Sequence, residues 1–403
     1  MSAAIRQYLV ITGNYWAFTL TDGALRMLVV LHFHQLGYSP LSIALLFIFY
    51  EFFGVVTNLV GGYLGARMGL NRTMNIGLFL QIVALAMLAV PAALLTVPWV
   101  MAAQALSGIA KDLNKMSAKS GIKLLVPDTE QGTLYKWVAI LTGSKNTLKG
   151  VGFFLGGVLL MAAGFTGAVV IMAVALGLVW LASLFLLGQD LGKSTAKPKF
   201  REILSKSRAI NVLSAARMFL FGARDVWFVV ALPVYMATAF GWDHWQVGGF
   251  MASWIIGYGV IQTLAPRITG HASGKSSAVI WAAMLALVPA AIAGALMAGL
   301  PAQAAVIGGL LLFGVLFAIN SSLHSYLIVR YARSDGVSLD VGFYYMSNAA
   351  GRLLGTLLSG WVYQTYGLEA CLWISAVLVA MAALLSVGLP DQALKPTGEK
   401  RYV

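Results

Sequence analysis

The sequence predicts an all-α membrane protein with twelve transmembrane helices arranged as two halves of six. The composition, the lengths of the apolar stretches and an internal repeat lead to this prediction. Of the 403 residues, 60% are hydrophobic and only 10% are charged. This small number of charged side chains cannot cover a water-exposed surface of this size. Most of the surface is therefore expected to face lipid. The composition therefore excludes a soluble globular enzyme.

The first half contains six apolar stretches, each about long enough for a helix to cross roughly 30 Å of hydrocarbon. Lipid-exposed strands with open edges could not satisfy their backbone polar groups there. The stretches lie near residues 8–33, 41–63, 74–95, 99–118, 134–162 and 166–188. The first contains Asp22 and Arg26 and lacks a small-residue cleavage site. We expect it to be a retained helix and not a signal peptide.

The second half repeats this pattern after one long polar interval. Its six stretches lie near residues 210–238, 245–268, 277–299, 303–328, 341–365 and 369–390. The interval contains the run LGKSTAKPKFREILSKSR. We predict an amino-terminal six-helix bundle over residues 1–188, a cytoplasmic linker over 189–208 and a carboxy-terminal six-helix bundle over 209–403.

The orientation follows from the loop charges, because lysine and arginine accumulate on the cytoplasmic side of a membrane. The tails and the even-numbered connections carry the basic loop residues, whereas the odd-numbered connections carry only the acids Asp243 and Glu369. We therefore expect a multi-pass protein of the inner (cytoplasmic) membrane, with both termini and the linker in the cytoplasm.

The two halves resemble copies of one another. An offset of 203 or 204 residues aligns Asp22 with Asp225, and Lys149 with Arg352. Twelve helices in a 6+6 repeat are typical of transporters whose bundles are related by an axis along the membrane normal. The pattern resembles the major facilitator superfamily, in which the first, fourth, seventh, tenth and eleventh helices line the substrate path.

Charged residues within the predicted spans are costly, at about 2.5 to 3.5 kcal/mol each at a helix centre, so most should face protein or water. Away from the ends of the spans, the cations are Arg26, Lys111, Lys115, Lys145, Lys149, Arg217, Arg224 and Arg352, and the acids are Asp22, Glu51, Asp112 and Asp225. Eight cations against four acids leave four positive charges unbalanced. This excess predicts an anionic ligand, and residues three or four apart share one helix face toward it.

The candidate site residues fall into three groups. Cations predicted to bind substrate are Arg26, Lys111, Lys145, Lys149, Arg224 and Arg352; acids predicted to form ion pairs or couple transport are Asp22, Glu51, Asp112 and Asp225; polar cavity residues are Tyr15, Asn348 and His324.

Several of these residues have a second, structural interpretation. Asp22 and Arg26 are four residues apart, so they form either a structural ion pair or one that also contacts substrate. Asp225 is expected to pair across helices. Glu51 is expected to be an unpaired carboxyl that takes up a proton, or a hydrogen-bonded structural acid. His324 is expected to contact substrate, relay a proton or join a polar packing network.

Other classes of protein lack support in the sequence. The single cysteine, Cys371, excludes an intramolecular disulfide, and the histidines have no partners at metal-ligand spacing. The net charge of +13 is not accompanied by a nucleic-acid-binding motif. No nucleophile–base constellation or nucleotide loop is visible. We therefore expect no enzyme activity, no metal, no cofactor and no nucleic-acid partner.

Two further cations, Lys115 and Arg217, lie nearer the cytoplasmic ends of their spans. Their side chains either extend toward the membrane surface or join the site.

Two motifs extend the resemblance to the superfamily. The segment GGYLGARMGLNRT resembles its cytoplasmic loop motif G-x-L-A-D-R-x-G-R-[RK], although Ala66 stands where the motif has aspartate. The run from Gly152 to Gly157 resembles the antiporter motif G-P-x-x-G-G without its proline, and this run favours close helix packing.

Four longer segments resemble one family within the superfamily, the organoarsenical efflux transporters known as ArsJ. They are YWAFTLTDGALRMLVVLHFHQLGYSP, YEFFGVVTNLVGGYLGARMG, QALSGIAKDLNKMSAKSGIKLLVP and LTGSKNTLKGVGFFLGG. The resemblance implies export of 1-arseno-3-phosphoglycerate, which a glyceraldehyde-3-phosphate dehydrogenase makes when it uses arsenate in place of phosphate. It thus implies arsenate resistance and a functional link to that dehydrogenase.

Alternatives remain open at this point. An organophosphate or phosphate exchanger needs the same basic cavity, whereas a proton-coupled multidrug exporter usually has an apolar one. A membrane-bound sensor or enzyme is the alternative from another class. We expect the partners to be a small anionic substrate and the lipid bilayer, and the protein to be a monomer.

Overall fold

The structure is a computed structural model that describes residues 3–38, 46–127, 130–187, 192–193, 207–270 and 274–390. Secondary structure in this part of the chain is helical. The helices are α1 (Ala3–Gln35), α3 (Ile48–Met68), α4 (Leu70–Leu88), the short 3₁₀ helix η1 (Ala92–Leu94), α5 (Val97–Leu125), α6 (Gln131–Leu186), α7 (Arg208–Phe228), α8 (Ala231–Ala239), α9 (His244–Thr269), α10 (Lys275–Met297), α11 (Ala302–Tyr331) and α12 (Val337–Ser386). The predicted all-α fold is confirmed.

The two longest helices are each broken by a glycine. Gly164 interrupts α6 with φ of 68°, and Gly367 interrupts α12 with φ of 82°. Only glycine adopts such angles without strain, so each break is where the chain turns back. The breaks fall between the predicted spans 134–162 and 166–188 in α6, and between 341–365 and 369–390 in α12.

The predicted span 210–238 is divided into α7 and α8. Pro233 lies in the first turn of α8 and has no backbone N–H, so it cannot continue the hydrogen bonding of α7. The Ser359 hydroxyl accepts hydrogen bonds from the backbone N–H groups of Val230 and Ala231, at 3.3 and 3.1 Å. One buried side chain thus satisfies the backbone donors freed at the break.

Each of the twelve predicted spans corresponds to a described helix, with α7 and α8 forming one span and α6 and α12 forming two each. Seven stretches are long and apolar enough to cross a membrane by themselves: α4, α6, α7 with α8, α9, α10, α11 and α12. Helices α1, α3 and α5 are 33, 21 and 29 residues long but lie outside this set. These three carry several of the predicted site charges.

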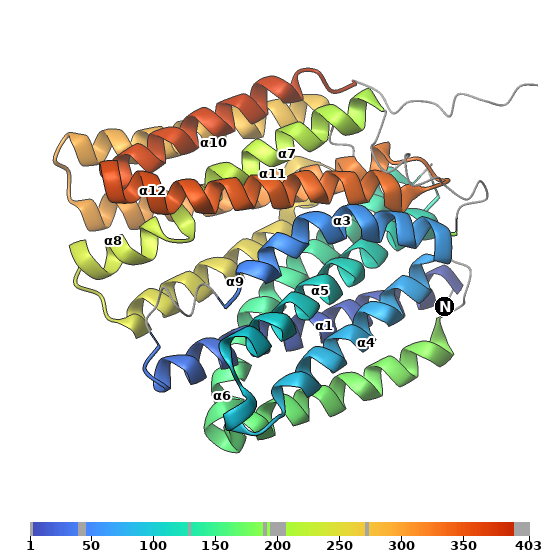
Figure 1. Ribbon diagram of the computed structural model, residues 1–403. Helices are drawn as coiled ribbons and strands as arrows, with labels where there is room; N and C mark the ends of the chain where they lie inside the picture. The colour runs from blue at the N-terminus through green and yellow to red at the C-terminus, as the bar shows by residue number, and fades with distance from the viewer. Residues whose placement is uncertain are drawn as a thin grey trace, which may run out of the picture.

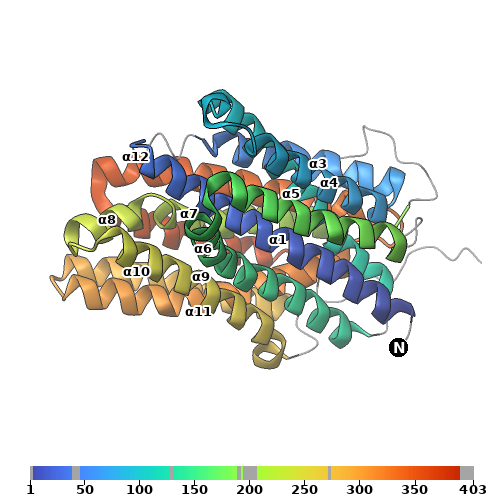
Figure 2. The same cartoon turned by 90° about the horizontal axis from the view of Figure 1, so that it is seen from below.

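The helices form two groups (Figure 1). In the amino-terminal half, α1 packs on α6 and α4 packs on α5; in the carboxy-terminal half, α7 and α10 pack on α12, and α9 packs on α11. The halves meet where α3 contacts α12 and where α6 contacts α9, as Figures 1 and 2 show from two directions. The predicted linker, residues 189–208, lies mostly outside the described residues, and the domain boundaries stay a prediction.

Small residues bring the halves together at both contacts. A Cβ added at Gly342 of α12 would lie 2.7 Å from the carbonyl oxygen of Asn58 in α3. A Cβ added at Gly259 of α9 would lie 2.6 Å from the carbonyl oxygen of Gly143 in α6. Both distances are shorter than van der Waals contact, so these backbones approach each other only because side chains are absent.

The end of the molecule that holds the start of α1 and the start of α7 is tightly closed. The ring of Tyr135 in α6 stacks on that of Tyr326 in α11 at 4.5 Å. The Tyr135 hydroxyl lies 3.1 Å from the Thr269 hydroxyl of α9. The segments Met116–Lys123 of α5 and Leu316–Val329 of α11 are buried throughout. We call this end of the bundle the terminal end.

Candidate functional site

A chain of ion pairs crosses the centre of the molecule from one half to the other. The Glu51 carboxylate of α3 lies 3.0 Å from the Arg26 guanidinium of α1 and 3.5 Å from the Arg352 guanidinium of α12. Arg352 also contacts Asp225 of α7 at 3.1 Å, and Asp225 pairs in turn with Arg224. The five side chains form one connected network that joins the halves through Glu51 and Arg352.

The structure shows the partners of three residues, Arg26, Glu51 and Asp225, for which residue spacing suggested a different partner or left two alternatives. Arg26 pairs with Glu51 of the neighbouring helix instead of with Asp22. Its guanidinium lies over the Phe47 and Tyr50 rings, 5.1 and 4.8 Å from their centroids, and these rings direct it toward α3. Of the two alternatives for Glu51, the unpaired carboxyl is wrong, because two arginines contact it. The expected pairing of Asp225 across helices is confirmed.

Tyr50, which was not among the residues predicted for the site, organises the amino-terminal side of this network. Its hydroxyl donates a hydrogen bond to the Asp22 carboxylate at 2.7 Å. The Lys111 ammonium of α5 lies 3.7 Å from the centroid of its ring, a distance typical of a cation–π contact. One buried aromatic ring therefore positions an acid and two cations. In the sequence, Tyr50 directly precedes the charged residue Glu51, and this position could have identified it as a site residue.

Lys149 reaches the same level of the bundle from α6. A Cβ added at Gly23, the neighbour of Asp22 in α1, would lie 2.7 Å from the Lys149 carbonyl oxygen, so the two backbones touch there. We call Arg26, Lys111, Lys149, Arg224 and Arg352 the outer cations. With Asp22, Glu51 and Asp225 they bring together residues from α1, α3, α5, α6, α7 and α12.

A second set of cations lies closer to the terminal end; we call Lys115, Lys119, Lys145 and Arg217 the inner cations. Arg217 donates to the Asn348 side-chain oxygen at 2.9 Å and to the Ser321 carbonyl at 3.2 Å. Arg217 and Arg224 are seven residues apart on α7, which corresponds to about 10.5 Å along a helix axis. The two sets thus form two levels along the bundle.

The inner cations have one carboxylate among them. Lys115 contacts Asp112 at 2.6 Å within α5, and Lys119 contacts the Thr142 hydroxyl. Lys119 was missed because the predicted span ended at residue 118, yet its side chain is buried, with 3% exposure. Within the described part of the chain, no salt bridge joins Lys145 or Arg217 to a carboxylate.

The cations of the two levels outnumber the acids. Nine cations, the eight expected from the sequence and Lys119, lie with the four acids Asp22, Glu51, Asp112 and Asp225. In the described residues, Lys111, Lys145 and Lys149 have no carboxylate partner. Buried charge without a counter-ion is unfavourable, so the arrangement favours a bound anion.

The three predicted polar residues occupy different environments. Asn348 binds Arg217, as described above. Tyr15 is buried within α1, with 2% exposure. His324 is completely buried, and neither ring nitrogen has a hydrogen-bond partner among the residues that the structure describes. The structure thus brings Asn348 into the inner level, whereas the roles of Tyr15 and His324 stay predictions.

The outer cations and Glu51 are partly exposed, whereas the terminal end is tightly packed. Arg26, Glu51 and Arg352 keep 25%, 31% and 31% of their side-chain surface exposed. The helices on the terminal side of them are buried, as the segments of α5 and α11 show. From this difference in burial among the described residues we infer that water and solutes reach the network from the opposite end.

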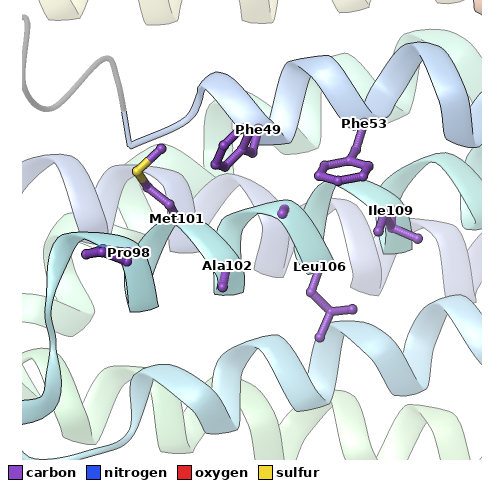
Figure 3. A pocket seen from close by; sticks show the side chains of 8 residues that line it. Phe49, Phe53, Pro98, Met101, Ala102, Leu106 and Ile109 are labelled. Carbon is purple, nitrogen blue, oxygen red and sulfur yellow. The ribbon is translucent and has the colours of Figure 1, made fainter.

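A separate groove of about 570 Å³ lies between α3 and α5 (Figure 3). It is lined by Phe49, Phe53, Pro98, Met101, Ala102, Ala105, Leu106 and Ile109. No lining residue is ionisable, so the groove has nothing to hold a charged solute and we do not assign it to the site. Among the described residues, no group of three His, Cys, Asp or Glu side chains is placed to hold a metal ion.

Comparisons with known proteins identify the fold. The family model of the Major Facilitator Superfamily matches residues 9–339 and 218–401. A search of curated proteins finds no match.

Solved structures similar to the chain include three transporters. The proton:xylose symporter XylE bound to 6-bromo-6-deoxy-D-glucose has a TM-score of 0.74 and 13% identity, with 94% of each chain covered. The human organic anion transporter MFSD10 (TETRAN) has a TM-score of 0.76 and 16% identity, covering 96% of this chain and 100% of its own. A bacterial homologue of the iron transporter ferroportin in an outward-facing state has a TM-score of 0.75 and 13% identity, covering 94% and 98%. At these identities the likeness concerns the fold.

Proposed function

Because the chain belongs to the major facilitator superfamily, we propose that it is an efflux permease for 1-arseno-3-phosphoglycerate, an organic anion with an oxyanion at each end. Members of this superfamily are multi-pass membrane transporters of small molecules and not enzymes. This chain is therefore a membrane transporter and not an enzyme. The substrate rests on the four segments that resemble the organoarsenical efflux transporters, and on the charge of the central site.

The observation that carries the proposal is the excess of cations at two levels of the bundle. Arginine and lysine recognise phosphate-like oxyanions through charge-assisted hydrogen bonds. The outer cations, which include Arg352 and Lys149, suit one end of the substrate. The inner cations, which include Arg217 and Lys145, suit the other end. This arrangement supports a ligand with two separate negative groups over one with a single charge.

The direction of transport is consistent with the charge of the substrate. We infer from the loop charges that the terminal end faces the cytoplasm of a cell whose inner membrane holds the protein. An inside-negative potential favours the exit of anions by about 2.3 kcal/mol per charge for each 100 mV. Export of a multiply charged anion can therefore proceed without an energy source besides the potential.

The transport cycle follows from the two contacts between the halves. With the terminal end in the cytoplasm, the described conformation faces outward, because the outer cations are reached from the opposite end. Rocking of the halves at the α3–α12 and α6–α9 contacts would open the terminal end and expose the inner cations to cytoplasmic substrate. The substrate then passes from one level of cations to the other.

An organophosphate or phosphate exchanger is the second candidate, because the same two levels of cations suit an organic phosphate. The two functions differ in substrate and in the need for a counter-substrate. A proton-coupled multidrug exporter fits poorly with nine cations at the centre of the bundle.

Arsenic uptake into inside-out vesicles tests the proposal. Arsenate, a purified glyceraldehyde-3-phosphate dehydrogenase and its substrates are supplied outside, where the cytoplasmic face of the transporter lies. We expect accumulation that requires the dehydrogenase reaction and is lost in Lys149→Ala and Arg352→Ala. The exposed Lys193→Ala variant, outside both levels of cations, serves as the control and should retain uptake.

Two results would argue otherwise. Accumulation no greater than in empty vesicles, with folded protein present, would exclude this substrate. Uptake of 3-phosphoglycerate only in exchange for phosphate loaded inside the vesicles would favour the exchanger.

A further inference from the structure

Glu51 occupies the place that a bound oxyanion is expected to take. A single carboxylate oxygen, Oε1, lies 3.0 Å from Arg26 Nη2 and 3.5 Å from Arg352 Nη2. This salt bridge joins the two halves, because Glu51 lies in α3 and Arg352 in α12. Glu51 therefore neutralises cations of both halves in the way that a substrate phosphate or arsenate group would.

The groups around Glu51 are mostly cationic. Arg26 of α1 and Arg352 of α12 contact the carboxylate, and Lys111 of α5 lies over the ring of the adjacent Tyr50. Of the acids nearby, Asp22 binds Tyr50, and Asp225 binds Arg224 and shares Arg352 with Glu51.

Exposure distinguishes Glu51 from the other acids. Its side chain is 31% exposed, whereas those of Asp225 and Asp112 are 0% and 1% exposed. A solute that enters from the open end can therefore reach the Glu51 carboxylate and the two guanidinium groups it contacts. Asp225 also contacts Arg352, so it can hold this arginine in place when Glu51 leaves.

We propose that Glu51 is an internal competitor of the substrate, a carboxylate that fills the cation site when it is empty and leaves when the anion binds. This inference rests on the proposed transport of an organic anion. The arriving oxyanion takes over Arg26 and Arg352, and the salt bridge between the halves opens. The displaced carboxylate then lies beside an anion and has lost its cations.

A carboxylate in that position is neutralised by a proton, because a neighbouring negative charge disfavours its ionised form. The proton comes from the solvent on the side to which the site is open. No covalent bond forms or breaks, and one proton is taken up for each anion bound. Glu51 thereby couples the movement of the anion to the movement of a proton in the same direction.

Isothermal titration calorimetry of the purified full-length protein tests this role, with 3-phosphoglycerate as the probe. Titrations at one pH in two buffers of different ionisation enthalpy give the number of protons taken up. We expect about one proton for each 3-phosphoglycerate bound to the wild type. Glu51→Gln should bind the anion at least tenfold more tightly and without proton uptake.

Two further variants serve as controls. Asp243→Asn removes an exposed carboxylate that caps α9 and lies outside both levels of cations, and asparagine can still cap the helix, so this variant should keep the proton uptake of the wild type. Glu51→Asp keeps the charge but shortens the side chain, so it should compete less well and bind the anion more tightly than the wild type. It carries the test if Glu51→Gln does not fold.

The outcomes separate this inference from the proposed function. If the wild type binds 3-phosphoglycerate but the Glu51 variants bind it no more tightly, the competitor role is overturned and anion transport stands. Binding without proton uptake by the wild type would overturn the coupling. If no folded variant binds the anion, the proposed function fails, and the inference with it.

Discussion

At the scale of the residue, the sequence identifies which side chains are charged within the membrane but not which of them pair. Spacing along α1 suggests a pair between Asp22 and Arg26, yet each binds a residue of α3 instead. Such partners depend on how neighbouring helices are rotated against each other, and single-helix periodicity contains no information on this rotation. The acid expected to be unpaired, Glu51, is the one shared by both halves.

Tyr50 gives a prediction at this scale. Tyr50→Phe keeps the ring beneath Lys111 and Arg26 but removes the hydroxyl that binds Asp22. Loss of a hydrogen bond to a buried carboxylate lowers the free energy of unfolding by about 1 to 3 kcal/mol. We therefore expect a protein that still folds, with a lower melting temperature and slower transport. Thermal unfolding and vesicle uptake measure the two effects. An unchanged melting temperature would mean that the hydroxyl does not hold Asp22.

At the scale of the element, the apolar pattern locates the helices well but not their internal breaks. The turns at Gly164 and Gly367 fall in the gaps predicted between apolar stretches. The division between α7 and α8 was not predicted, because the residues on both sides of Pro233 are apolar and read as one span. Hydropathy cannot detect a break whose freed backbone groups are satisfied by a serine from another helix.

Two glycines of α9 provide a matched test of the contact between the halves. A Cβ at Gly259 would lie 2.6 Å from the Gly143 carbonyl oxygen, whereas a Cβ at Gly257 would meet nothing within 4 Å. Gly259→Ala should force α6 and α9 apart and reduce transport at least tenfold, while Gly257→Ala should be nearly neutral. Vesicle uptake at equal protein amounts measures both. Equal activity of the two variants would contradict the close approach.

At the scale of the whole molecule, the repeat and the charge balance predicted the two halves and the basic centre. The sequence does not reveal the conformation, because packing at the terminal end depends on contacts between distant segments such as Tyr135 and Tyr326. It also does not reveal that the cations lie at two levels, since that requires the relative heights of α5, α6 and α7.

The orientation of the molecule gives a separate prediction. Lys193→Cys places a thiol at an exposed position, and its neighbour Gly192 lies against Leu70 and Leu124 near the terminal end. A membrane-impermeant maleimide should label it in inside-out vesicles and not in intact cells. The wild type, whose single cysteine Cys371 is buried, serves as the unlabelled control. Labelling from outside intact cells would reverse the orientation inferred from the loop charges.

The most direct test of the two-level site compares two ligands that differ at one end. 3-Phosphoglycerate has a phosphate and a carboxylate, whereas glycerol 3-phosphate has only the phosphate. We expect the wild type to bind the first at least tenfold more tightly, a difference of about 1.4 kcal/mol. Arg217→Gln should abolish this preference without weakening the binding of glycerol 3-phosphate. Equal affinities in the wild type, or a preference that survives in Arg217→Gln, would contradict a site that holds an anion at both ends.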